Sequence, residues 1–196
     1  MKTISIVISV ILFSLCLHAQ ETTSINKVPK QYSLEGGYRN LFSVIDNANA
    51  LNGNKVMNGY GFLFDYAWKL SGLNGKKPGA FISVPIGYSV LLPANAASTQ
   101  MSLLSYGWTV RHELAVNKPL VPFVGYGLLL NTLKDKARDG GAMGHQTQFE
   151  FGYNLNTATR LKYFAKIAYS YTSFPQFDSN KRIHYQFADL RVGVRF

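Results

Sequence analysis

Apolar and polar side chains alternate along eight segments after residue 20, with turn-forming residues between them. The clearest segment is 59–70, where Tyr, Phe or Trp occupies every even position from 60 to 68. A strand repeats every two residues, so each segment is predicted to be a β-strand with one apolar face. No segment has the repeat of a long helix. The predicted strands are 31–42, 59–70, 80–92, 104–114, 120–132, 148–155, 160–171 and 183–196.

The last segment carries the most information about the environment of the protein. Leu190, Val192, Val194 and Phe196 share one face, and the chain ends on the aromatic residue. Such an edge strand would promote aggregation in water, whereas a closing strand of a membrane barrel has one face in lipid. The alternation changes phase near 187–188, which predicts a β-bulge or a portion that rises above the membrane.

Charge decides which face meets the lipid. Lys162 and Lys166 share a face, and placing them at the bilayer midplane would cost roughly 2–4 kcal/mol each. Domains are stable by only ~5–15 kcal/mol, so the charged faces are predicted to look inward. The predicted interior charges are Glu35, Arg39, Asp65, Lys69, Arg111, Glu113, Glu150, Arg160, Lys162, Lys166, Asp189, Arg191 and Arg195.

The connections predict the orientation of the barrel. An even number of strands with periplasmic termini makes the first connection extracellular. The extracellular loops are then 43–58, 93–101, 133–147 and 173–182, and the periplasmic turns are 71–79, 117–119 and 156–159. Aromatic residues near the strand ends predict two girdles, with Tyr38, Tyr60, Tyr88, Tyr169 and Tyr171 outside and Trp68 and Phe196 at the periplasmic end.

The N-terminus predicts export. Lys2 precedes an apolar run from Ile4 to Leu17, and Ala19 completes a cleavage site, so residues 1–19 are predicted to be a cleaved signal peptide. The run is too short to span a bilayer, which takes ~20 residues. Cys16 lies inside the signal, so the mature domain, 20–196, has no disulfide or thiolate. The net charge of +10 then favours lipid phosphates as partners over nucleic acid.

These patterns resemble the small eight-stranded outer-membrane barrels of the OmpX and OmpA transmembrane-domain type. The ending, with Val192, Val194 and Phe196, is similar to the signal by which such proteins engage the barrel-insertion machinery. The segment 122–127 is similar to a middle strand of these families. The resemblance implies an all-β, eight-stranded, antiparallel up-and-down transmembrane barrel, monomeric in the outer membrane of a Gram-negative bacterium. A soluble lipocalin-like barrel is the alternative, but it would enclose the charges around its ligand.

Enzymatic and channel functions are the alternatives to a structural role. Some small barrels modify lipid A with His, Ser and an acid, but His112, His145 and His184 have no serine two residues later. No metal or cofactor motif is present, so we expect neither. A barrel of eight strands is filled by its own side chains, which makes a solute channel less favoured.

The expected function is therefore structural, or binding and adhesion at the cell surface through the four loops. Lys134, Lys136 and Arg138 in the third loop are predicted contacts for lipopolysaccharide phosphates, with a solvated charged loop as the alternative. Phe174, Pro175 and Phe177 in the fourth loop are possible contacts for a protein partner, or they pack onto the rim.

Overall fold

The computed structural model describes residues 30–47, 54–71, 77–135, 141–156, 161–178 and 181–196. The predicted signal peptide (1–19), Cys16, Lys136, Arg138 and Arg160 lie outside these residues, as does the side chain of Phe177. Among the described residues, no helix is long and apolar enough to cross a bilayer.

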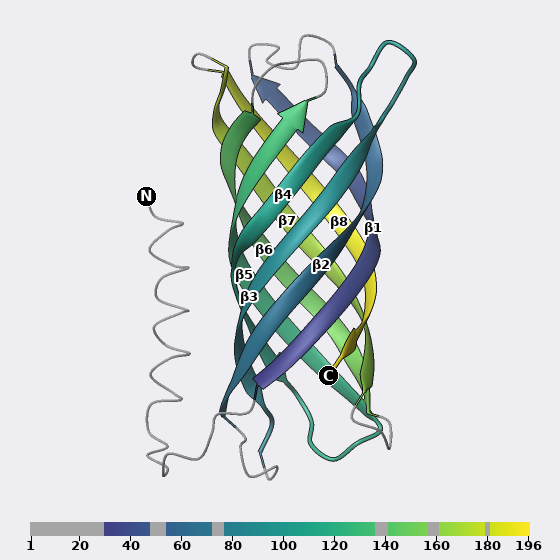
Figure 1. The fold of residues 1–196 in the computed structure, drawn as a ribbon, viewed down its shortest axis with the longest axis vertical. Helices are drawn as coiled ribbons and strands as arrows, with labels where there is room; N and C mark the ends of the chain where they lie inside the picture. The colour runs from purple at the N-terminus through teal and green to yellow at the C-terminus, as the bar shows by residue number, and fades with distance from the viewer. Residues whose placement is uncertain (1–29, 48–53, 72–76, 136–140, 157–160, 179–180) are drawn as a thin grey trace.

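Eight antiparallel strands close into one barrel, in which each strand pairs with its neighbours in the sequence and β8 pairs with β1 (Figure 1). This arrangement confirms the predicted fold class. The strands tilt strongly relative to the barrel axis, as closure requires. They are β1 Lys30–Asn47, β2 Val56–Ser71, β3 Ala80–Pro93, β4 Met101–Glu113, β5 Leu120–Asp135, β6 Gly141–Asn156, β7 Lys162–Asp178 and β8 Lys181–Arg195.

The two faces of the strands differ as the alternation predicts. Large apolar side chains cover the outside, and Phe62, Ile167 and Val192 are each about 60% exposed. Charged and polar side chains alternate with them on the inside, and Glu35, Asp65 and Lys166 are buried there. An apolar exterior around a closed barrel is unfavourable in water and favourable in lipid, so the barrel spans a membrane.

Aromatic rings mark both edges of the membrane-facing band. At the periplasmic end, where β1 begins and β8 ends, Tyr32 stacks on Phe196 and packs against Tyr66 at centroid distances of 5.9 and 4.9 Å. Toward the other end, Phe42 and Tyr169 pack at 5.9 Å. Amphipathic rings favour the headgroup level, which makes these rings the two girdles of the barrel.

One prediction about the outer end is wrong, and another is reduced to one of its two alternatives. The hairpin of β7 and β8 continues through most of the predicted loop 173–182, and β6 already begins at Gly141. Near 187–188, β8 has no bulge, because Ile183, Tyr185 and Phe187 are buried on the same face as Asp189 and Arg191. The interior changes there from charged to apolar, which leaves a portion above the membrane as the explanation. A register shift opposite this point lies in β1, between Leu41 and Ser43.

Candidate functional site

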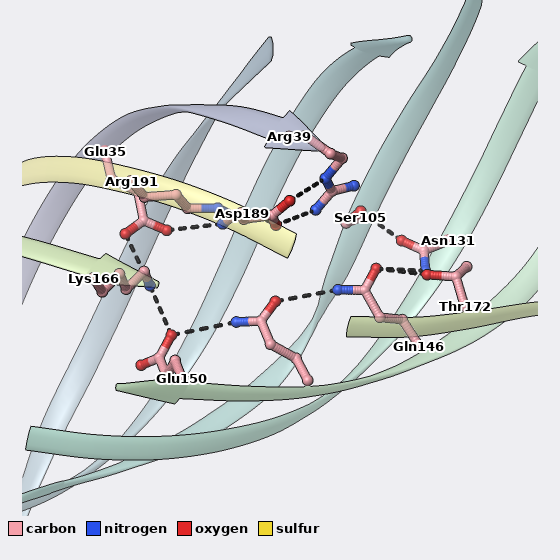
Figure 2. A network of polar contacts seen from close by, with 11 residues as sticks. Glu35, Arg39, Ser105, Asn131, Gln146, Glu150, Lys166, Thr172, Asp189 and Arg191 are labelled. Atoms are coloured by element: carbon pink, nitrogen blue, oxygen red, sulfur yellow. Dashed lines mark hydrogen bonds and ion pairs between the residues drawn. The ribbon is translucent and has the colours of Figure 1, made fainter. Parts of the chain in front are cut away.

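Charged side chains of alternating sign cross the barrel interior (Figure 2). The Arg39 guanidinium donates to both carboxylate oxygens of Asp189, from Nε at 2.9 Å and from Nη2 at 2.8 Å. Asp189 also accepts from Arg191 Nη2 at 2.6 Å, and Arg191 Nη1 donates to Glu35 Oε1 at 3.0 Å. Paired, charge-assisted hydrogen bonds of this kind offset the cost of burying charge.

A lysine extends this chain of charges from β1 and β8 to β7 and β6. Lys166 Nζ lies 2.9 Å from Glu35 Oε2 and 2.8 Å from Glu150 Oε2, so one ammonium joins two carboxylates. The resulting set contains three positive and three negative groups and is neutral as a whole. We call it the ionic network; it consists of Glu35, Arg39, Glu150, Lys166, Asp189 and Arg191.

Neutral polar groups continue the network toward the outer end. Gln148 Nε2 donates to the carboxylate of Glu150 at 3.3 Å, and Gln146 Nε2 donates to Gln148 Oε1 at 3.1 Å. Gln146 Oε1 in turn accepts from Asn131 Nδ2 at 3.2 Å and from Thr172 Oγ1 at 3.1 Å. These groups come from β5, β6 and β7, so the polar network fixes the interior of several strands at once.

Glycines on the inner face make room for the long charged side chains. Gly125 pairs with Glu150, and a Cβ at Gly125 would lie 2.6 Å from Glu150 Oε1. Gly152 pairs with Lys166, and a Cβ there would lie 2.7 Å from the Lys166 Cβ. A larger residue at either position would therefore displace a member of the ionic network.

Arginines stacked on phenylalanines fill the periplasmic end of the interior. The Arg195 guanidinium lies 4.0 Å from the centroid of Phe164 and 4.8 Å from that of Phe123. Arg111 lies 4.4 Å from the centroid of Phe81. These cation–π contacts place the two guanidinium groups against aromatic faces.

The other predicted interior charges lie near the same end. Asp65 is buried, whereas Lys69, Glu113 and Lys162 are half-buried. Glu113 Oε1 accepts from Asn154 Nδ2 at 3.3 Å, and Lys69 Nζ lies 5.8 Å from the ring of Phe81.

Little space remains between these side chains. A cavity of about 20 Å³ borders Glu35, Arg39 and Asp189, and another of about 10 Å³ borders Asp65 and Arg111. Each volume has room for about one water molecule. Asp65 Oδ1 and Arg111 Nε have no hydrogen-bond partner in the described part of the chain, so the second cavity is polar enough to hold water.

The interior at the outer end is apolar. Tyr185 is fully buried there and packs edge-on against Phe174, with ring centroids 6.0 Å apart. The Tyr185 hydroxyl donates to Met101 Sδ at 3.7 Å, and Arg39 lies 4.6 Å from the Phe187 centroid, which joins this layer to the ionic network. We call this layer the mouth core; it consists of Leu41, Val56, Leu91, Met101, Leu103, Leu133, Ala142, Phe174, Ile183, Tyr185 and Phe187.

The mouth core lies beyond the outer girdle, at the ends of the strands. Burial, together with the carboxylates of Asp46 and Asp135, raises the pKa of Tyr185, so its hydroxyl stays neutral. For Phe174, the alternatives are contact with a partner and packing onto the rim. The second holds, because β7 continues through Phe174 and buries it fully in the mouth core. Pro175 is exposed.

A polar clamp ties the connections together above the mouth core. Asn54 Nδ2 donates to Asp135 Oδ2 at 3.1 Å, and Thr99 Oγ1 donates to Asp135 Oδ1 at 2.7 Å. The Thr99 backbone N–H donates to Asn54 Oδ1 at 2.9 Å. Two connections and the end of β5, which are distant in the sequence, are thus joined at the outer end of the barrel. Lys134, the described member of the predicted lipopolysaccharide contact, is exposed beside this clamp.

Two histidines lie on the outer surface just beyond the girdle. The register pairs Ser173 with His145 on one side and with His184 on the other, so the three residues form a row across β6, β7 and β8. The Tyr171 hydroxyl lies 2.8 Å from His184 Nδ1. Burial, followed by the positive charges of Arg182 and His145, lowers the pKa of His184. Sequence spacing did not reveal this row, because its members come from three strands.

The remaining histidine and the end of the chain lie at the periplasmic side. His112 is half-buried, and its ring stacks on Tyr126 at 6.3 Å. Val192 and Phe196 are exposed, and Val194 is half-buried. Phe196 exchanges two backbone hydrogen bonds with Tyr32, of 2.9 and 3.0 Å, so the last residue still belongs to the seam that closes the barrel. Within the described ranges, no cluster of three or more potential metal ligands occurs.

The barrel was compared with known proteins. No family model and no curated protein sequence matches the chain. Among solved structures, Neisserial surface protein A (NspA) matches with a TM-score of 0.51 and 15% identity, over 85% of this chain and 94% of that chain. The chain has the fold of the small eight-stranded outer-membrane barrels. That fold and the apolar exterior make it an outer-membrane protein.

Two further structures share the strand count at lower similarity. The N-terminal β-barrel domain of Pseudomonas aeruginosa OprF matches at TM-score 0.48 and 14% identity, over 85% of this chain and 97% of that domain. Ail of Yersinia pestis, in a structure with the heparin analogue sucrose octasulfate, matches at TM-score 0.45 and 15% identity, over 85% and 99% of the two chains.

Proposed function

We propose that this protein is a non-conducting, non-enzymatic outer-membrane barrel that stabilises the outer leaflet and presents its extracellular loops to a partner at the cell surface. The observation that carries the proposal is the filling of the interior. The ionic network and the mouth core follow one another along the barrel axis, and the two cavities beside the network have room for about one water molecule each.

A filled interior leaves the outer surface as the place for function. The clamp of Asn54, Thr99 and Asp135 supports this view, because it joins residues of two connections to the end of β5. Fixed loops lose less conformational entropy when a partner binds. Lys134, Lys136 and Arg138 are proposed to contact the phosphates of lipopolysaccharide, since cationic side chains form charge-assisted hydrogen bonds with phosphate.

Photo-crosslinking in intact cells tests the proposal. A photoreactive residue is placed at Lys134 or Pro175 on the extracellular side, and at Lys118 in a periplasmic turn as the matched control. We expect the extracellular positions to capture lipopolysaccharide or a defined surface protein that the control does not capture. Identical products from all three positions would contradict a specific role for the loops.

The row of His145, Ser173 and His184 suggests a hydrolase as the alternative function. Tyr171 occupies Nδ1 of His184, and the carboxylates of Asp46 and Asp135 act on the buried Tyr185 rather than on this row. A nucleophile of this type needs a base that is oriented by a third group. We expect the mass spectrum of lipid A to be identical with and without the protein. The loss or gain of an acyl chain would reverse the assignment.

A further inference from the structure

The row of His145, Ser173 and His184 carries an inference that does not depend on the proposed role of the loops. Arg182 lies two residues before His184 on β8, so both side chains point to the outside of the barrel. His145 and Arg182 are exposed, and His184 is half-buried. Three nitrogen-bearing side chains therefore gather on one outward surface beyond the girdle. We call His145, Arg182 and His184 the rim patch.

The charges that act on His184 are positive. The neighbours of His184 on the adjoining strands are Tyr171 and Ser173 on β7 and Ile45 on β1, which pairs with it. His145 follows on β6, beyond Ser173. The electrostatic neighbours of His184 are Arg182 and His145, and both disfavour its protonated form. Cationic groups that repel one another in this way are stabilised by a bound anion.

The geometry suits a single phosphate group. His145 and His184 lie on strands separated by one intervening strand, so their backbones are roughly 10 Å apart. Ser173 lies between them and is buried, so only the two histidines and Arg182 are open to a ligand. When Tyr171 donates to Nδ1 of His184, the neutral ring keeps its proton on Nε2, which remains a donor. A phosphate between the two histidines would then meet donors from β6 and β8.

The position of the rim patch identifies the source of the phosphate. Tyr169, which packs on Phe42 in the outer girdle, lies two residues before Tyr171 on the outward face of β7. Girdle aromatics lie at the level of the headgroups, so the rim patch faces the polar part of the outer leaflet. We infer that His145, Arg182 and His184 bind a phosphate group of an outer-leaflet glycolipid.

Binding to lipid nanodiscs tests the inference with the mature protein. The probes are diphosphoryl lipid A, the same lipid A without phosphates, and inorganic phosphate. We expect diphosphoryl lipid A to bind, and Arg182→Gln and His184→Gln each to weaken its binding roughly tenfold, as loss of a charge-assisted hydrogen bond does. Lys118→Gln removes one positive charge at the opposite end and is the matched control.

The pH dependence provides a second readout. A phosphate that contacts the histidines favours their protonated forms, so affinity should rise as the pH falls from about 7.5 to about 6, the range in which histidine titrates. In His145→Gln/His184→Gln this rise should be lost. Ring resonances of His184, followed by NMR, should show a higher pKa when diphosphoryl lipid A is present.

Three outcomes would overturn the inference. Equal binding of lipid A without phosphates would show that acyl chains alone are recognised. Equally tight binding of inorganic phosphate would show a site for a free anion rather than for a lipid. Unchanged affinity in Arg182→Gln and His184→Gln would place the lipid elsewhere. None of these outcomes bears on crosslinking from Lys134 or Pro175, so the two proposals fail independently.

Discussion

The ionic network and the mouth core fill the same barrel with opposite chemistry. The network lies where the outside of the barrel faces lipid, and it holds buried charges such as Glu35 and Lys166. The mouth core lies beyond the outer girdle and holds residues such as Leu103, Leu133 and Phe187, each no more than 1% exposed. One closed sheet thus encloses a polar interior along the membrane and an apolar interior above it.

The difference shows how the surroundings decide what a barrel buries. Within the bilayer, the hydrocarbon of the lipid accepts the apolar side chains, so the interior can be polar. Beyond the headgroups the exterior meets water, and burial of apolar side chains again becomes the main source of stability. The mouth core therefore stabilises the extended outer hairpins as the core of a soluble domain would.

The largest effect is expected from breaking the ionic network at its shared cation. Lys166→Met leaves Glu35 and Glu150 facing each other without the ammonium that joins them. Removing one partner of a buried ion pair costs about 3–5 kcal/mol, and we expect that loss in the free energy of unfolding. Urea unfolding in lipid vesicles measures it.

The control for this substitution is Lys134→Met, at an exposed position near the end of β5. Surface substitutions usually change stability by less than about 0.5 kcal/mol. Equal losses in the two variants would mean that the buried position of Lys166 has no energetic consequence.

A smaller but clear loss is expected in the mouth core. Leu133→Ala removes a fully buried side chain, and such substitutions cost about 2–5 kcal/mol. The same unfolding experiment applies, with Leu130→Ala as the control because Leu130 is 47% exposed on the lipid-facing side of the same strand. If Leu130→Ala is the more destabilising of the two, the mouth core is not a true core.

Arg39 lies at the boundary between the ionic network and the mouth core, so a substitution there tests how the two regions are joined. Arg39→Lys keeps the positive charge but loses the bidentate hydrogen bonds to Asp189. It also weakens the cation–π contact with Phe187. Arginine and lysine are not equivalent at such sites, so we expect a loss of about 1–3 kcal/mol. No loss would indicate that charge alone holds Asp189 in place.

The smallest effect is expected at Tyr185. Tyr185→Phe removes only a hydroxyl that bonds weakly to Met101, and we expect a loss below about 1 kcal/mol. Because burial raises the pKa of Tyr185, its contribution is complete below the unfolded pKa of about 10 and falls as the pH rises further. The wild-type protein should therefore lose more stability at high pH than Tyr185→Phe, and an identical decline would contradict this burial.

The sequence predicted most of the barrel because alternation and charge are local signals. The eight strands, their antiparallel order and the inward direction of Glu35, Lys166 and Arg191 follow from period two and from the cost of charge in lipid. The change of apolar phase near 187–188 left a β-bulge and a portion above the membrane as alternatives. The second holds, because β8 passes from the membrane-embedded part into the mouth core.

The contacts within the interior and on the rim depend on register, which alternation does not give. The pairing of Gly125 with Glu150, for example, makes space for a charge, but neither residue identifies the other in the sequence. His145 and His184 are brought to either side of Ser173 by two separate pairings. Sequence spacing therefore predicted which residues face inward or outward, but not which of them meet.

Single-channel recording tests the central claim, that both regions of the interior are filled. The mature protein is inserted into a planar bilayer and recorded in parallel with a large porin of known conductance. With the ionic network and the mouth core in series, we predict no conductance above the baseline, in the wild-type protein and in Leu133→Ala, because the ionic network still fills the barrel. A steady, voltage-independent current from the wild-type protein would contradict the account.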